Sequence, residues 1–341
     1  MLKRMQRKEK TGKTQTDGEL ALVEQIRRRA AGAAPAVRLG IGDDCALLRV
    51  RPGEELAVTT DLTIAGEHFR LDWHPPEAAG HRTLARGLSD LAAMGARPVA
   101  AFLSLGLPVE LTRHRRGQPA WIERFLDGLL ALANEYEVPL AGGDLAGSAL
   151  PVADIVLVGA ARRGRALLRS GARAGDLLYV TGKLGGAAAG LAQLAKRGGA
   201  RGRIGDEAAQ AMARHLYPQP RVEQGLWLAR RGVATAAMDL SDGLSTDLAR
   251  LCTESGLAAE VDADALPVAE GATLEQALNG GEDYELLFTA PESARLPRRI
   301  GGVGVTRIGR TMKNRSGQPQ ITLFAAGHRR ALQPGGWEHF T

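Results

Sequence analysis

The sequence predicts two domains of mixed α/β (or α+β) architecture, and three observations support this fold class. A chain of 341 residues is longer than one hydrophobic core usually serves. Segments with helical and strand-like apolar periodicity alternate irregularly, which argues against a single wound sheet. The Arg- and Gly-rich segment 162–175 is typical of a domain junction. We therefore expect a disordered basic arm at 1–16, a first domain at 17–161 and a second at 162–341.

In the first domain, capping and turn residues bound the expected elements. Asp17 suits the N-cap of a first helix, and Pro76 suits the start of a long helix at 77–94. The apolar stripe of 120–136 predicts another helix. Strands are expected at 39–50, 55–60, 99–107, 138–140 and 152–160.

The second domain shows the same mixture. Helices are expected at 186–196, 206–215, 221–230 and 242–254, and strands at 176–181, 234–240, 257–262, 284–289, 305–310 and 321–325. The glycine-rich turn 182–190 leads into a helix whose N-terminus could receive an anion. Close packing of small residues is the alternative that a lone glycine motif leaves open. The chain contains no P-loop motif.

The composition argues against several classes of function. The formal net charge is +6, but much of the excess lies before residue 14, and aromatic residues make up only 4%. This argues against a base-stacking nucleic-acid surface, although a basic nucleic-acid-binding protein is the non-enzyme alternative. Cys45 and Cys252 lie in apolar surroundings and are expected to be buried thiols of a reducing compartment. Without a signal peptide or a spanning run, we expect a cytoplasmic protein with no membrane partner.

The stretch Leu39–Leu48 places two adjacent carboxylates, Asp43 and Asp44, between a glycine pair and an apolar run. The apolar run favours burial, whereas unpaired carboxylates do not. The pair therefore needs a turn, a helix N-terminus or cations. If the stretch is an extended strand, the two side chains point to opposite sides. We expect Asp44 to bind a metal ion and Asp43 either to bond to that ligand from behind or to form a turn.

Further acidic residues occur at the ends of expected elements. Asp90 instead lies within a helix among Leu, Ala and Met, where a carboxylate needs a partner or a metal ion. Taken singly, the others have a plain explanation as turn or cap residues; they are Asp61, Asp144, Asp239, Asp242, Asp247, Glu282 and Asp283. Together such oxygen ligands suit several Mg²⁺ ions holding phosphate groups. The Cys and His residues show no zinc-ligand spacing.

From about Asp17 to the C-terminus, the chain resembles the thiamine-monophosphate kinase family. The resemblance rests on short motifs in the family's order, at 41–44, 59–69, 88–96, 142–144, 179–182, 218–221, 238–244, 280–286 and 336–340. It implies the two-domain fold shared with aminoimidazole ribonucleotide synthetase, with an α/β C-terminal domain and a homodimer whose N-terminal domains build a β-barrel. It also implies ATP-dependent phosphorylation of thiamine monophosphate to thiamine diphosphate by direct in-line transfer.

The resemblance also implies roles for individual residues. The implied Mg²⁺ ligands are Asp44, Thr59, Thr60, Asp61, Asp90, Asp144, Asp242 and Asp247, of which Asp90 and Asp242 are the expected catalytic residues. The implied ATP contacts are Gly143, Asp144, Arg169 and Ser245, and the implied contacts of thiamine monophosphate are His68, Glu282 and Trp337. A Trp face suits the cationic thiazolium ring. Another ATP-using synthetase or dikinase of the same superfamily is the alternative function.

Overall fold

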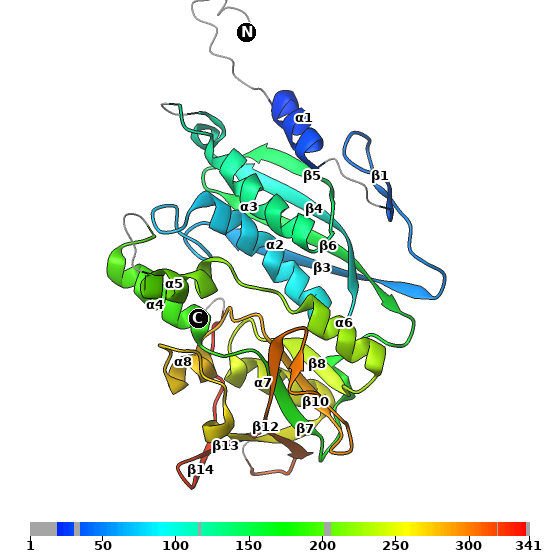
Figure 1. Cartoon of the computed structure of the whole chain (residues 1–341), viewed down its shortest axis with the longest axis vertical. Helices are drawn as coiled ribbons and strands as arrows, with labels where there is room; N and C mark the ends of the chain where they lie inside the picture. The colour runs from blue at the N-terminus through cyan, green and yellow to red at the C-terminus, as the bar shows by residue number, and fades with distance from the viewer. Residues whose placement is uncertain (1–18, 31–34, 115–116, 201–205, 319, 339–341) are drawn as a thin grey trace, which may run out of the picture.

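The computed structural model describes residues 19–30, 35–114, 117–200, 206–318 and 320–338, so the expected arm at 1–16 lies outside the described residues. Figure 1 shows two packed parts, each with its own sheet and helices, one at the top of the view and one at the bottom. This mixed α/β arrangement confirms the expected fold class. Within the described ranges, no helix is both long and apolar enough to cross a membrane.

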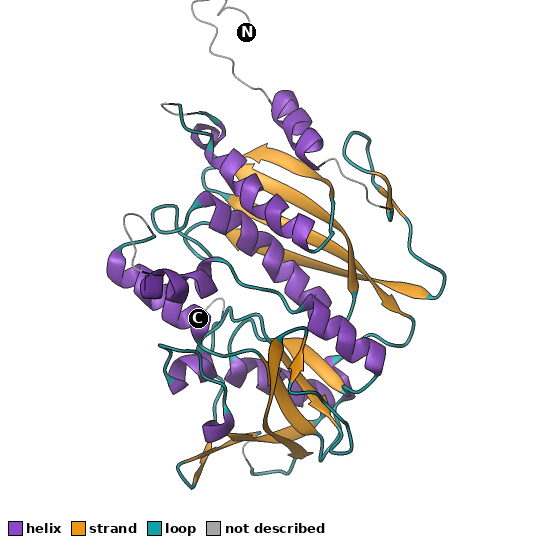
Figure 2. Ribbon diagram, in the orientation of Figure 1, coloured by secondary structure: helices purple, strands orange, loops and turns teal. Residues whose placement is uncertain are grey.

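The first sheet has the strand order β3 (Glu54–Ile64), β6 (Val152–Arg162), β4 (Arg97–Leu107) and β5 (Leu140–Gly147). β6 pairs antiparallel with both neighbours, whereas β4 and β5 are parallel and are connected through α3 (Trp121–Glu135). α2 (Pro76–Ala93) and α3 lie side by side along this sheet (Figure 2). β3 and β5 are free edges, so the described residues of one chain form no closed barrel.

The side chains of β3 alternate between the two faces of this sheet, with the period of two of a strand. Thr59 and Asp61 point toward α2, where they bond to Asp90 and Arg86. Leu56 and Val58 point the other way and are 56% and 62% exposed. The sheet therefore has a covered face under α2 and an apolar face that is open to solvent at β3.

The second sheet has eight strands. Seven follow the order β14 (His328–Ala331), β13 (Ile321–Ala325), β9 (Leu257–Asp262), β12 (Val303–Lys313), β7 (Leu177–Thr181), β10 (Leu286–Ala290) and β8 (Ala236–Asp239), and β11 (Arg299–Ile300) pairs with β12. The helices of this half are α4 (Gly186–Arg197), α5 (Asp206–Leu216), α6 (Val222–Arg231), α7 (Leu244–Ser255) and α8 (Leu274–Asn279). The expected elements of this half are confirmed to within a few residues, but β11, β14 and α8 were not predicted.

The stretch 39–50 is not a single strand, so that prediction was wrong. After α1 (Glu19–Ala30), β1 (Val37–Leu39) and β2 (Leu47–Leu48) pair antiparallel, and the chain reverses between them. Gly42 permits the reversal with a φ of +124°. Asp43 Oδ1 accepts the N–H of the next residue, Asp44, at 2.9 Å, and both residues are exposed on this reversal.

The two cysteines have different environments. Cys252 on α7 is buried as expected, and burial raises the pKa of its thiol to about 12. Cys45 is exposed, so the expectation of a second buried thiol was wrong. The reason is the turn between β1 and β2, which leaves the residues around Cys45 at the surface instead of in a buried strand.

α2 touches its neighbouring helices at backbone distance. A Cβ atom added to Gly128 of α3 would lie 1.8 Å from the carbonyl oxygen of Glu77 at the start of α2. A Cβ on Gly225 of α6 would lie 1.9 Å from the carbonyl oxygen of Ala92 at its end. Only glycine permits these contacts, since real Cβ atoms essentially never come within 3.0 Å of such atoms. Of the 18 residues of α2, 15 are buried, so its placement is closely constrained.

Gly128→Ala is expected to lower the free energy of unfolding by about 2 kcal/mol or more, because the added methyl group forces α2 and α3 apart. Urea denaturation followed by circular dichroism measures the change. Gly147→Ala is the matched control, since nothing lies within 4 Å of its Cβ position. Its effect should stay within about 0.5 kcal/mol. Equal stability of the two variants would contradict the importance of this helix contact.

Candidate active site

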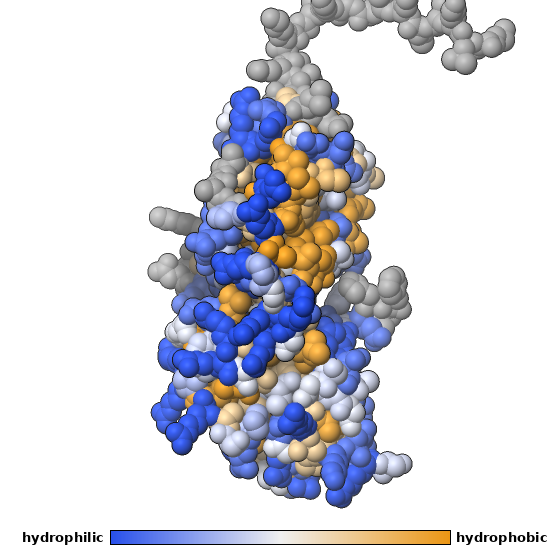
Figure 3. All heavy atoms as spheres, turned by 90° about the vertical axis from the view of Figure 1, so that its right-hand side faces the viewer, coloured by the Kyte–Doolittle hydropathy of each residue, from blue (hydrophilic) through white to orange (hydrophobic). Residues whose placement is uncertain are grey.

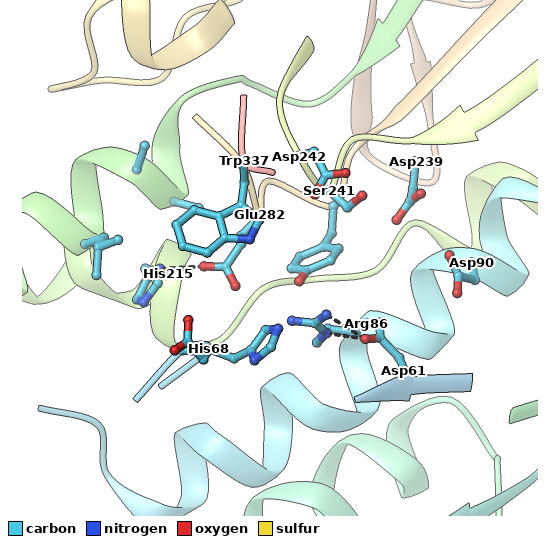
Figure 4. A pocket seen from close by; sticks show the side chains of 16 residues that line it. Asp61, His68, Arg86, Asp90, His215, Asp239, Ser241, Asp242, Glu282 and Trp337 are labelled. Carbon is cyan, nitrogen blue, oxygen red and sulfur yellow. Dashed lines mark hydrogen bonds and ion pairs between the residues drawn. The ribbon is translucent and has the colours of Figure 1, made fainter. Parts of the chain in front are cut away.

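A cavity of about 240 Å³ opens between α2, α4, α5 and the loops that precede α7 and β10. Its lining side chains divide into two groups (Figure 4). We call the group Asp61, Asp90 and Asp239 the acidic end. We call the group His68, His215, Glu282 and Trp337 the aromatic end. Asp242 lies between them.

One face of α2 supplies polar groups to both ends of the cavity. Arg82, Arg86 and Asp90 recur every four residues, a spacing that places them on one helix face. Arg86 Nε donates to Asp61 Oδ1 at 2.8 Å, and Asp90 accepts the hydroxyl of Thr59. The hydroxyl of Ser89 donates to Asp239 Oδ2 at 2.7 Å and so ties α2 to β8 of the second half.

The acidic end holds buried carboxylates whose charges are incompletely compensated. Burial and the nearby Asp90 carboxylate raise the pKa of Asp239 to about 8. Burial also raises the pKa of Asp90, against the lowering effect of the Thr59 hydroxyl and of Arg169 and Arg86. A cation bound between the carboxylates would oppose both shifts, because it stabilises their charged forms.

The segment before β10 points three carboxylates in three directions. Asp283 accepts the N–H groups of Gly185 and Ala187 at 2.6 and 3.1 Å, so the chain's own carboxylate occupies the N-terminus of α4. The anion site considered for the turn 182–190 is therefore filled from within. Glu285 bonds to Arg221 through both oxygens, at 2.6 and 2.5 Å. Glu282 faces the cavity, with a φ of +67° that a non-glycine residue rarely adopts.

Asp247 holds the loop before α7 in place. Its Oδ2 accepts the N–H groups of Ser241, Asp242 and Gly243 at 3.0 to 3.1 Å. Burial and the neighbouring Asp242 raise the pKa of Asp247 to about 6. Gly243 and not Asp242 is the N-cap of α7, so Asp242 is left to line the cavity and to pair with Arg250. Asp247 thus fixes the backbone of the loop that carries Asp242.

The C-terminal segment is anchored on the same loop. Gly335 N–H donates to the Ser245 hydroxyl at 3.1 Å, and Trp337 N–H donates to the carbonyl oxygen of Asp242 at 3.0 Å. A Cβ on Gly336 would lie 2.0 Å from that same carbonyl oxygen, so only glycine allows this approach. These contacts carry the Trp337 ring to the aromatic end, while Ser245 is buried beneath the segment.

The structure brings most of the expected site residues together. Those that line the cavity are Asp61, His68, Asp90, Asp242, Glu282 and Trp337. Thr59 joins them through its bond to Asp90. Arg169 lies near enough to Asp90 and Asp239 to lower the pKa of both.

Other expected site residues lie elsewhere. Asp144 pairs with Ser104 inside β5, not at the strand end that was expected, and faces away from α2, as does Thr60. Gly143 is next to Asp144 in β5, and Asp44 is on the exposed β1–β2 turn. Across the described ranges, no three His, Cys, Asp or Glu side chains form a group that could hold a metal ion. The expected ligands are therefore not gathered around one point within a single chain.

The residues of this region that the sequence-based assignment missed include Arg82, Arg86, His215 and Asp239. Arg82 and Arg86 could have been found from the sequence. Like Asp90, they are charged residues in a mostly apolar helix, and such residues need a partner. Asp239 was noticed at a strand end but received no role. His215 lies in the last turn of α5 without any local motif, and only the packing of α5 reveals its position.

Comparison with known proteins identifies the family. A model described as AIR synthase related protein, N-terminal domain, matches residues 42–161, and its C-terminal counterpart matches 173–321. Thiamine-monophosphate kinase of Salmonella typhimurium is 41% identical over 337 residues, covering 95% of this chain and 98% of that protein.

Solved structures point the same way. The crystal structure of thiamine-monophosphate kinase from Stenotrophomonas maltophilia is 36% identical with a TM-score of 0.76, covering 90% of this chain and 96% of that one. A structure of AaThiL complexed with AMPPCP and TMP is 30% identical with a TM-score of 0.72, covering 97% and 99%. Identity at this level over nearly the whole length shows that the chain belongs to the thiamine-monophosphate kinase family.

Proposed function

We propose that this chain phosphorylates thiamine monophosphate to thiamine diphosphate with ATP, by direct in-line transfer, as the last step of thiamine diphosphate biosynthesis. The observation that carries the proposal is the cavity whose acidic and aromatic ends lie on either side of Asp242. Relatives named thiamine-monophosphate kinase support it, as does the neighbour complexed with AMPPCP and TMP. Such a transfer needs positioning and charge neutralisation more than covalent chemistry from the protein.

The aromatic end suits the organic part of thiamine monophosphate. We propose that the Trp337 ring and the Glu282 carboxylate contact the thiazolium and its aminopyrimidine, because a cation favours both an aromatic face and a carboxylate. His68 Nδ1 accepts the N–H of Ile64 at 3.1 Å, so in the neutral ring the proton is on Nε2. We assign His68 Nε2 to the substrate phosphate.

We propose that the acidic end binds Mg²⁺ ions together with ATP phosphates. Asp90 and Asp239 fit a cation, because burial and the Asp61 carboxylate raise the pKa of Asp90, while burial and the Asp90 carboxylate raise the pKa of Asp239. Asp61, Thr59 and Asp242 complete the oxygen ligands that Mg²⁺ prefers. Bound Mg²⁺ would neutralise charge on the transferring phosphoryl group. Asp90 and Asp242 are our candidates for the catalytic residues, and Asp247 keeps a supporting position.

The nucleotide contacts extend beyond the cavity. Arg169 is close enough to the acidic end to contact ATP phosphates. Asp44, Thr60, Gly143 and Asp144 lie on the β1–β2 turn or on the sheet away from α2, and Ser245 is buried. We propose that the first four reach Mg²⁺ or ATP in the assembled dimer or after movement of the β1–β2 turn, and that Ser245 acts by anchoring the C-terminal segment.

We further propose a homodimer in which the open face of the first sheet meets its partner and completes a β-barrel. On β3 this face exposes Leu56, Val58 and Leu62, the last at 45%. Figure 3 shows hydrophobic side chains gathered on one side of the upper half of the molecule. A free edge strand with exposed apolar residues is normally covered by another chain or element. We also propose a cytoplasmic location and the domain boundary at 161/162.

The purified protein should convert thiamine monophosphate to thiamine diphosphate with Mg-ATP, and chelation of Mg²⁺ should stop the reaction. Chromatographic separation of the thiamine phosphates measures the product. ADP release with a panel of acceptors tests the alternative, another ATP-using enzyme of the superfamily. ADP release that depends on a different acceptor, without thiamine diphosphate formation, would overturn the proposal.

Asp90→Asn should reduce kcat by about a thousandfold, because the amide weakens cation binding at the acidic end. Its stability should not fall, since the substitution removes the repulsion between Asp90 and Asp239. Single-turnover assays and thermal unfolding measure the two quantities. Asp264→Asn, at an exposed site, is the matched control. Near wild-type turnover in Asp90→Asn would refute a shared metal site.

Val58→Glu should convert the dimer to a monomer of 36.1 kDa, because a charge would be buried in the proposed barrel. Light scattering after size-exclusion chromatography measures the mass. Leu168→Glu places the same charge at a residue that is 50% exposed elsewhere, and it should leave the dimer intact. A monomeric wild-type protein at micromolar concentration would contradict the proposed assembly.

A further inference from the structure

A line of buried polar groups runs from the turn before α2 to the Glu282 carboxylate. His74 Nδ1 accepts the N–H of Arg70 at 3.1 Å, and His74 Nε2 lies 3.0 Å from Nε2 of His215. His215 Nδ1 in turn lies 3.3 Å from Glu282 Oε2. The two histidines are 5% and 2% exposed. Neither was among the residues expected from the sequence to form the site.

The proton positions in this line follow from its hydrogen bonds. Burial and the Arg82 charge lower the pKa of His74 to about 4 and the pKa of His215 well below its ordinary value, so both rings are neutral. A neutral imidazole has one donor and one acceptor nitrogen. Because His74 Nδ1 accepts from Arg70, His74 donates through Nε2 to His215. The proton of His215 is therefore on Nδ1, which faces Glu282.

Arg82 holds the other oxygen of the same carboxylate. Its guanidinium donates to Glu282 Oε1 and also to the carbonyl oxygens of His215 and His68. The Arg82 side chain is 3% exposed and so cannot exchange these partners for water. Glu282 thus has one oxygen facing an arginine and the other facing a histidine. Its φ of +67° is a strained conformation that persists where the surroundings over-determine it.

The contact between His215 and Glu282 is not fully made in this state. His215 Nδ1 has no hydrogen-bond partner within the described residues, and 3.3 Å is long for an N–H···O bond. A buried donor without a partner is unfavourable. A small rotation of the carboxylate toward His215 is therefore favoured and would turn Glu282 within the cavity beside Trp337 (Figure 4).

We propose that His215 is a positioning residue that, with His74 behind it and Arg82 opposite, sets the orientation of Glu282 toward the organic cation of the substrate. This inference rests on the function proposed above, because it takes Glu282 as the group that contacts the aminopyrimidine or thiazolium. Once His215 donates to Oε2, opposite the Arg82 bond to Oε1, the plane of the carboxylate is fixed, and Glu282 selects a substrate by the direction of the substrate's N–H groups and positive charge. His215 is thereby a determinant of acceptor specificity.

The test compares two variants of His215 by steady-state kinetics with varied thiamine monophosphate and with varied ATP. His215→Leu removes both ring nitrogens, and KM for thiamine monophosphate should rise about tenfold or more, well beyond any change in KM for ATP. His215→Asn keeps an amide donor near the position of Nδ1 and should restore most of this loss. His328→Leu, at an exposed histidine of β14, is the matched control and should leave both KM values unchanged.

A double-mutant cycle separates positioning from direct contact. In a Glu282→Gln background, His215→Leu should have little further effect on KM for thiamine monophosphate, because the oriented carboxylate is already absent. An undiminished effect in that background would overturn the inference, and so would an unchanged KM in the single variant. Circular dichroism checks folding, and His74→Leu, one step further from the cavity, should show the same KM shift if His215→Leu does not fold.

Wild-type turnover is measured first. If the wild-type protein does not phosphorylate thiamine monophosphate, the proposed function fails. If it does, and His215→Leu has the wild-type KM for thiamine monophosphate, only the positioning role fails.

Discussion

The backbone contacts of α2 are the constraint on which the site depends. Gly128 of α3 and Gly225 of α6 let these helices touch both ends of α2, and most of α2 is buried as a result. Polar groups on a buried helix cannot be hydrated, so each needs a partner within the protein. α2 finds such partners in both halves of the chain: Ser89 bonds to Asp239 of β8, and Asp90 bonds to Thr59 of β3. The packing of one helix therefore sets where the two halves meet and where the cavity forms.

Charge is distributed unevenly along this cavity, and the difference separates two kinds of chemistry. At the aromatic end, the Glu282 carboxylate has Arg82 beside it and a histidine that burial keeps neutral. At the acidic end, the three carboxylates of Asp61, Asp90 and Asp239 outnumber the two arginines Arg86 and Arg169, and the pKa of Asp90 and the pKa of Asp239 are both raised. The aromatic end suits an organic cation, which needs a single carboxylate in a fixed orientation. The acidic end suits metal ions that bring their own charge.

Much of the fold and part of the site could be predicted from local pattern. Pro76, the helical periodicity and Gly95 correctly bounded α2, and Asp90 stood out because a carboxylate in an apolar helix needs a partner. The prediction of a single strand across Leu39–Leu48 was wrong. Its apolar residues do not reveal the chain reversal that Gly42 makes possible. Asp144 and Asp61 resemble each other in sequence context, yet they lie on opposite faces of one sheet. Only the strand register separates them.

The sequence by itself determined the elements, the mixed α/β class, the family and most of the acidic residues around the cavity, because these depend on residues that are neighbours along the chain. The tertiary structure alone decided which carboxylates share the cavity and which support it from behind. Asp247, a predicted metal ligand, bonds through Oδ2 to three backbone N–H groups of its own loop, a contact that no sequence motif indicates. His215, which no motif marks, comes next to Glu282 only when α5 packs beside α2. Such pairings join residues far apart in sequence, and the energy that selects them comes from burial and mutual charge compensation in the folded chain.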